Sequence, residues 1–287
     1  MAMPLCTIPG VSDVLESVEW LRENLDRVLL LDVRGEVAAG QPRYRAYPDR
    51  YRAGHLPGAV FADWSLDFTD RSAAVPVTIA TPEGFAADAT RLGIGADTPV
   101  VAYDDYFNAL AGRVVWALRS YGHQRARLLD GGLRAWTDAG GVLEEGEVEP
   151  RPAQPPHPVP GRLEGLIDLD QLRHEIARGV TLLDARAAAE YDGRETHARR
   201  AGHIPGALNV PYKSLLADDG RFLPGRRLME VLTQAGVPLD RPLIAYCNGG
   251  VSATVLANAV EIATGRRPAV YDGSWNEWGN RDDTPVE

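Results

Sequence analysis

Short apolar runs alternate with amphipathic segments along most of the 287-residue chain. The runs are rich in Val, Leu and Ile and are typical of buried strands, whereas the segments between them have the apolar spacing of helices. We predict strands at 28–33, 100–103, 127–129, 180–183, 243–245 and 269–271. We predict helices at 17–25, 81–93, 108–121, 133–139, 168–178, 226–235 and 251–264. Strands that alternate with helices indicate an α/β fold, in which a parallel sheet carries helices on both faces.

The pattern occurs twice. Residues 52–59 read RAGHLPGA, and residues 200–207 read RAGHIPGA. Other positions recur at separations that shrink slowly, as small deletions would produce: Asp32 and Asp184 are 152 apart, Tyr103 and Tyr246 are 143 apart, and Trp136 and Trp278 are 142 apart. A repeat of this length predicts two copies of one domain rather than a solenoid.

A change of composition separates the two copies. Residues 142–161 contain six prolines and four glutamates, which is typical of an extended, semi-rigid linker. A proline-motif ligand is the alternative interpretation of this segment. We therefore predict a first domain at 1–141, a linker at 142–161 and a second domain at 162–287.

Cys247 is the candidate reactive residue of the second copy. It follows a predicted strand and precedes Gly249, Gly250 and the start of a helix. Backbone N–H groups in such a loop form an anion cradle, and the helix N-terminus adds partial positive charge. A thiol held there should have a pKa below the usual value of about 8.5. The alternative is a small buried core residue, but packing gains nothing from two adjacent glycines.

The first copy differs at the matching position, where Tyr103 is followed by Asp104. It therefore lacks the nucleophile and the glycines. We also expect the carboxylate of Asp104 to repel an anionic substrate. The first copy is predicted to be non-catalytic and to close over one side of the second copy's site.

Composition and charge narrow the function. The formal net charge of −10 opposes binding to nucleic acid or to an anionic membrane. No apolar stretch approaches 18 residues, and the N-terminus has no secretory signal pattern. Cys6 and Cys247 are the two cysteines, and Cys6 lies in a segment expected to be frayed, so a reduced cytoplasmic protein is predicted. We find no zinc-ligand spacing and no nucleotide-binding fingerprint.

Three motifs together resemble the tandem-domain rhodanese-like sulfurtransferases, which include thiosulfate and 3-mercaptopyruvate sulfurtransferases. They are GH(I/L)PGA in both halves, Asp-x-Arg after the first strand of each half, and Cys-x-x-Gly-Val-Ser-Ala at Cys247. The resemblance implies that the Cys247 thiolate takes a sulfane sulfur from a small anionic donor, as a persulfide. A thiol or cyanide then removes that sulfur, and no metal or organic cofactor is required.

The resemblance also implies the substrate-binding residues. Arg186 matches an arginine that faces the cysteine and holds the donor's anionic end; its alternative role is to pair with Asp184. Arg194 lies in a basic loop that the mercaptopyruvate branch uses to bind a carboxylate. The remaining members are the loop residues Asn248, Gly249, Gly250, Val251 and Ser252.

Two histidines and a serine have open roles. We expect His55 and His203 to be loop-packing residues, because both occur in the repeated motif and only one half has the cysteine. A relay from His55 to a serine cannot form, because that position is Gly249. Ser252 either donates a hydrogen bond to the sulfur or caps the helix.

Two other functions are considered. A cysteine phosphatase needs an arginine six residues after the cysteine, where this chain has Ala253. A persulfide carrier without turnover is the second alternative.

The neutral pair Asn248 and Gly249 predicts a preference for 3-mercaptopyruvate over the dianion thiosulfate. The acceptor and the oligomeric state are left open.

Overall fold

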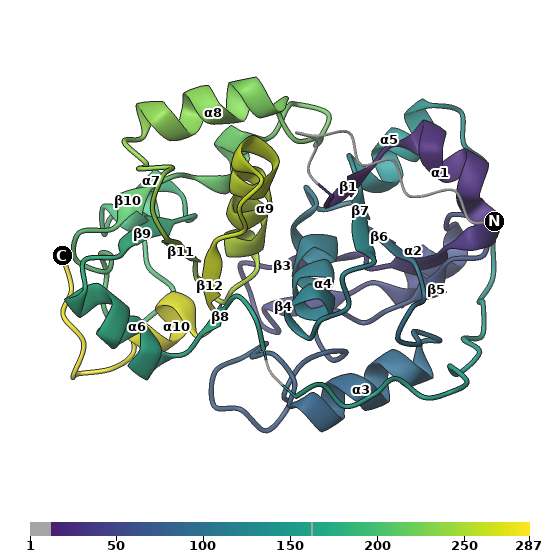
Figure 1. Ribbon diagram of the computed structural model, residues 1–287, viewed down its shortest axis with the longest axis horizontal. Helices are drawn as coiled ribbons and strands as arrows, with labels where there is room; N and C mark the ends of the chain where they lie inside the picture. Colours follow the sequence, from purple (N-terminus) through teal and green to yellow (C-terminus); the bar gives the residue numbers. More distant parts are fainter. Residues whose placement is uncertain (1–12, 162) are drawn as a thin grey trace.

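The computed structural model describes residues 13–161 and 163–287 and contains two five-stranded parallel sheets, one in each half (Figure 1). In the first sheet the order is β1 (Leu15–Glu16), β7 (Ala126–Leu129), β6 (Val100–Tyr103), β2 (Leu29–Asp32) and β5 (Val60–Phe61). In the second it is β10 (Leu208–Asn209), β9 (Thr181–Asp184), β11 (Leu243–Tyr246), β12 (Ala269–Tyr271) and β8 (Leu166–Ile167). When the second order is read from β8 to β10, the two orders match strand by strand, with β8 in the place of β1 and β11 in the place of β6. This match confirms the predicted α/β repeat.

Helices cover both faces of each sheet. Those of the first half are α1 (Val18–Asn24), α2 (Pro48–Ala53), α3 (Pro82–Arg91), α4 (Ala109–Ser120) and α5 (Gly132–Asp138). Those of the second are α6 (Leu169–Ala177), α7 (Ala188–Tyr191), α8 (Gly225–Gln234), α9 (Ser252–Thr264) and α10 (Ser274–Trp278), and short 3-10 turns occupy Leu25–Arg27 and Tyr212–Leu215. Local signals set several starts. Thr81 caps α3 through the Gly84 N–H, and Asp168 and Gln171 form a reciprocal capping box on α6.

The sequence pattern did not reveal the shortest elements. The edge strands β1, β5, β8 and β10 have two residues each, too few for a periodicity to register. It also missed an antiparallel hairpin, β3 (Gly35–Val37) and β4 (Tyr44–Ala46), which follows β2 in the first half only. This hairpin matters for function because it reaches the second half.

Helices α4 and α9 pack against each other between the two sheets (Figure 1). Every residue of α4 is buried, and one apolar core continues across both halves. Two buried ion pairs cross the contact: Arg119 bonds Glu261 at 3.0 and 2.7 Å, and Arg113 bonds Asp272. The two copies therefore form one packed unit.

Residues 142–161 lie along the first half. The Gly146 N–H donates to the Arg52 carbonyl at 2.9 Å, and the Ala153 N–H donates to the Thr90 carbonyl at 2.8 Å. An extended segment can thus form its backbone hydrogen bonds with the surface along which it lies. This part of the chain is attached rather than a free tether.

Candidate active site

Cys247 lies at the carboxyl end of β11, where the chain turns into α9, and its side chain is 1% exposed. Ser274 holds the loop, because its Oγ accepts from the Cys247 N–H at 3.2 Å and from the Gly250 N–H at 3.1 Å. Ser274 has a φ of +50°, and its hydroxyl donates to the Tyr271 carbonyl. The loop after β12 therefore fixes the backbone of the cysteine loop.

The loop presents N–H groups that have no protein acceptor. No hydrogen bond among the described residues uses the N–H groups of Gly249, Val251 or Ala253. These N–H groups lie between the buried cysteine and the first turn of α9, where the helix dipole also favours an anion. The arrangement is an anion cradle at Cys247, with N–H groups that no protein acceptor uses.

The first half contains the same cradle, filled by its own carboxylate. Asp104 accepts from the N–H groups of Tyr106 (2.8 Å), Asn108 (3.0 Å), Leu110 (2.9 Å) and Ala111 (2.9 Å). Tyr106, Asn108 and Leu110 each lie 143 residues before a member of the trio Gly249, Val251 and Ala253. The first half thus shows which kind of group this loop binds: an anion.

Asp104 does not line the cavity at Cys247, although its charge reaches residues of the cavity wall. Its side chain is 2% exposed and is enclosed by its own loop. Complete burial raises the pKa of Asp104 to about 6, although the N–H donors act in the opposite direction. The carboxyl is therefore ionised at neutral pH and above, and its charge acts on the hydroxyls of Tyr106 and Tyr212 in the cavity wall.

The two glycines serve the packing as well as the loop. Gly250 has a φ of +71°, and a Cβ on it would lie 2.8 Å from Nη1 of Arg113. A Cβ on Gly249 would lie 2.7 Å from the Tyr44 hydroxyl and 2.9 Å from Nδ2 of Asn276. Side chains of both halves, Arg113 and Tyr44 from the first and Asn276 from the second, therefore occupy the space that larger residues would need.

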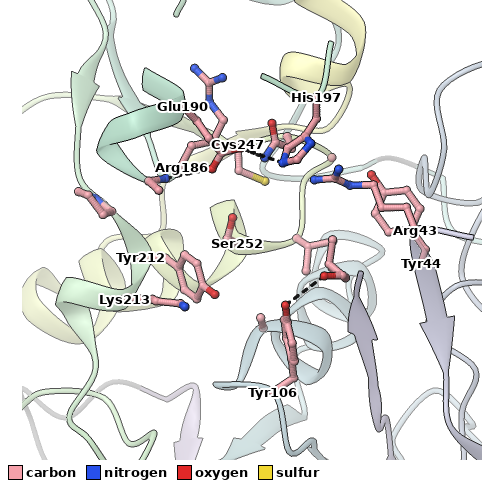
Figure 2. A pocket seen from close by; sticks show the side chains of 17 residues that line it. Arg43, Tyr44, Tyr106, Arg186, Glu190, His197, Tyr212, Lys213, Cys247 and Ser252 are labelled. Atoms are coloured by element: carbon pink, nitrogen blue, oxygen red, sulfur yellow. Dashed lines mark hydrogen bonds and ion pairs between the residues drawn. The ribbon is translucent and has the colours of Figure 1, made fainter. Parts of the chain in front are cut away.

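A cavity of about 290 Å³ opens at Cys247 between the two halves, and Figure 2 shows the sulfur pointing into it. The second half contributes most of its wall, including the loop of Cys247 and the turn of Tyr212 and Lys213. The first half contributes Val37, Arg43, Tyr44, Tyr106 and Ala109. Of the predicted site residues, the cavity is lined by Cys247, Arg186, Asn248, Gly249, Val251 and Ser252.

Arg186 combines both roles considered for it. Its Nε and Nη2 atoms bond the Asp184 carboxylate at 2.6–3.0 Å, and Nη2 also bonds the Gly202 carbonyl at 2.8 Å. Burial opposes its charge, but the Asp184 contact outweighs this and raises the pKa of Arg186. Arg34 makes the equivalent bonds to Asp32 and to a glycine carbonyl in the first half, which lacks the Cys247 loop. Most of these contacts therefore belong to the fold, and Nη1 of Arg186 is free of protein bonds.

Arg194 lies outside the cavity wall. Its side chain is exposed and pairs with Asp192 at 2.8 Å. Gly250 is also absent from the wall, because its contacts are with Arg113 and Asp272. The structure thus brings together six of the eight predicted positions.

The histidines pack as predicted for the repeated motif. His55 stacks on Tyr51 and bonds its carbonyl through Nδ1, and His203 does the same with Tyr191. Neither lines the cavity. The capping alternative for Ser252 is wrong, because Ser252 is the first residue of α9 and no side chain caps that helix.

Several residues of the cavity wall were missed by the sequence analysis, among them Glu190 and His197. Oε1 of Glu190 accepts a hydrogen bond from Asn248 at 2.7 Å, and His197 lies 3.8 Å from the same oxygen. Burial raises the pKa of Tyr44, Tyr106 and Tyr212, so their hydroxyls stay protonated at neutral pH. Arg43, Tyr44 and Tyr106 come from the first half, and no local motif connects them to a cysteine about 140–200 residues away.

Residues 13–161 and 163–287 contain neither a membrane-spanning helix nor a cluster of metal-binding side chains. No helix there is long and apolar enough to cross a membrane. No cluster of three or more His, Cys, Asp or Glu side chains in these ranges could hold a metal ion. Cys6 lies outside the described residues, so its predicted position is untested by the structure.

Comparisons with known proteins agree on one family. The rhodanese-like domain family matches residues 17–139 and 168–281. The chain is 39% identical over 264 residues to "Putative thiosulfate sulfurtransferase SseB" of Mycobacterium tuberculosis, covering 91% of each protein. It is 34% identical to "Sulfur carrier protein TtuD" of Thermus thermophilus, covering 96% of each. The crystal structure of SseA from Escherichia coli, a 3-mercaptopyruvate sulfurtransferase, superposes with a TM-score of 0.80 at 30% identity, covering 91% of this chain and 98% of that one.

Proposed function

The chain belongs to the rhodanese-like sulfurtransferase family, and from this premise we propose that Cys247 carries the transferred sulfur as a persulfide. The Cys247 thiolate attacks the sulfane sulfur of the donor and forms an S–S bond. The donor's own bond to that sulfur breaks, and its electron pair leaves with sulfite or with the enolate of pyruvate. An acceptor thiol or cyanide then attacks the outer sulfur and regenerates the thiolate.

One observation carries the proposal: the N–H groups of Gly249, Val251 and Ala253, which no protein acceptor uses, lie beside a buried thiol. The outer sulfur of a persulfide is an anion, and inward N–H groups stabilise it. Asp104 shows that the same loop shape holds a buried negative charge in the first half. The two-domain division at 142–161 then assigns catalysis to residues 162–287 and part of the cavity wall to residues 1–141.

We further propose 3-mercaptopyruvate as the preferred donor. Asn248 and Gly249 carry no charge, but the first half adds a positive charge to the cavity wall through Arg43. The proposal therefore rests on the absence of cations from the cysteine loop itself. The check is the ratio of kcat/KM for mercaptopyruvate to that for thiosulfate; a ratio below one contradicts the preference.

The persulfide is tested by mass spectrometry of the intact protein after donor is added without acceptor. One sulfur atom adds about 32 Da, and peptide mapping should place it on Cys247. Cys247→Ser should abolish both the added mass and turnover, whereas Cys6→Ser should retain them. Turnover by Cys247→Ser would contradict the assignment.

A sulfur carrier is the second candidate, favoured by the similarity to TtuD. A carrier would release one equivalent of sulfur and stop, whereas an enzyme releases many equivalents under the same conditions. Product sulfide and thiocyanate measured over several enzyme equivalents separate the two. In either case a reducing compartment such as the cytoplasm would keep the thiol in the required state.

A further inference from the structure

We propose that Arg43, a residue of the half without the cysteine, binds the anionic group of the sulfur donor beside Cys247. This inference rests on the proposed function and adds a specificity-determining residue to it. Arg43 lines the cavity at Cys247. Figure 2 shows its guanidinium extending from beside Tyr44 toward Cys247 and His197.

The backbone on both sides of Arg43 is fixed. The Arg43 carbonyl accepts from the Ala38 N–H at 2.6 Å, which closes the β3–β4 hairpin. The Tyr44 hydroxyl accepts from Nδ2 of Asn276 at 2.8 Å, across the contact between the halves. Tyr44 also lies against Gly249, where no Cβ would fit. The hairpin therefore holds Arg43 at a set position over the cysteine loop.

Arg43 lacks a carboxylate partner within the described part of the chain. Its Nε atom is buried and has no hydrogen-bond partner, and its guanidinium forms no ion pair. Its electrostatic contacts are with the hydroxyls of Tyr44 and Tyr106. A partly buried guanidinium whose charge is uncompensated favours an anion from outside the protein.

The other charged side chains of the cavity wall have partners within the protein or are exposed to solvent. Arg186 is neutralised by Asp184, and Glu190 accepts from Asn248. Lys213 is exposed and rests over the Phe107 ring at 5.5 Å. Arg43 is thus the partly buried, uncompensated cation among these groups.

Arg43 also faces a second hollow. A larger cavity of about 660 Å³ shares Arg43, Tyr44 and His197 with the cavity at Cys247. These three side chains stand between the two spaces. A guanidinium in this place can contact an anion on its way to the cysteine and retain it there.

The test compares two alkylating agents at Cys247. In both, the thiolate displaces iodide from the same carbon, but iodoacetate carries a carboxylate and iodoacetamide is neutral. The ratio of their rate constants cancels any change in thiolate content and reports the local preference for an anion. In Arg43→Met the ratio should fall at least about tenfold, as the loss of a charge-assisted contact implies, while the iodoacetamide rate stays near its original value.

Arg50→Met is the matched control. It removes one positive charge from the same half, but Arg50 is exposed, pairs with Asp105 at 3.7 Å and lies outside the cavity wall. Its ratio should not change. If Arg43→Met folds poorly, Arg43→Gln replaces it as the test variant, because glutamine keeps a polar side chain and removes only the charge.

An unchanged ratio in folded Arg43→Met or Arg43→Gln overturns the proposal, and so does an equal fall in Arg50→Met. The same variants should lose at least about tenfold in kcat/KM for mercaptopyruvate. Alkylation does not depend on sulfur transfer. A lowered ratio without turnover by the unmodified protein would therefore refute the proposed function and leave the anion site at Arg43 standing.

Discussion

Removing the carboxylate of Asp104 tests the cradle directly, in the half where it is occupied. Asp104→Gly leaves four N–H groups, those of Tyr106, Asn108, Leu110 and Ala111, without their acceptor. The matched control is Asp105→Gly, which introduces the same backbone freedom at the next residue. Asp105 is exposed and pairs with Arg50 at 3.7 Å, a weak ion pair.

The magnitude follows from the count of bonds. A buried N–H without a partner destabilises the fold by about 1–3 kcal/mol. Entering water should satisfy some of the four, so we expect a loss of about 4 kcal/mol for Asp104→Gly. For Asp105→Gly we expect about 1–2 kcal/mol, mainly from backbone entropy and one weak ion pair.

The assay is urea unfolding at pH 7.5, followed by tryptophan fluorescence and repeated in acetate and in chloride at equal ionic strength. Acetate fits the vacated space and should raise the unfolding midpoint of Asp104→Gly more than that of the parent or of Asp105→Gly. If Asp104→Gly loses no more stability than Asp105→Gly, the N–H groups do not depend on the anion. The use of Asp104 as a guide to the Cys247 cradle would then fail as well.

Two further changes extend the tests. Arg186→Met and Arg34→Met each break a buried ion pair with an aspartate, so each should destabilise the protein by about 3–5 kcal/mol. Only Arg186→Met should also lower kcat/KM, by tens-fold per folded molecule. Equal activities of the two variants would show that Arg186 serves only the fold. Burial raises the pKa of Glu16 to about 7, so the folded state holds a proton that the unfolded state releases above its usual pKa near 4.5. This contribution to stability is present at low pH and is lost as the pH rises through 7; Glu16→Gln should flatten that slope in urea midpoints at pH 5 and pH 7.5, and an unchanged slope would contradict it.

The sequence was most informative where the residues of one short stretch determine the local structure by themselves. Central strands such as β6 and β11 are continuous apolar runs, and Cys247 with its glycines shows a strand, a tight loop and a helix start in order. The repeat then supplied the domain organisation. These features depend on neighbours in the sequence, so they can be predicted from it.

The rest of the site depends on contacts between distant segments. Nothing around Arg43 or Tyr44 marks them as cavity residues, because the hairpin is polar and its target lies about 200 residues away. Ser274 was missed because its function follows from a φ of +50° that brings its hydroxyl under the cysteine loop. Arg194 was expected in the cavity because of the basic loop to which it belongs, and the structure places it with Asp192.

Arg113 has a consequence for how the gene can change. This α4 side chain bonds Asp272 and the carbonyls of Val77 and Gly250, so a residue of the first half supports the loop of the second. A deletion of the first half would remove both arginines together with α4, and it would expose the apolar side chains of α9 that now pack against α4. The copy without the Cys247 loop is therefore a structural part of the copy that carries it. Shortening the protein to one domain would require polar replacements on the face of α9 that α4 covers.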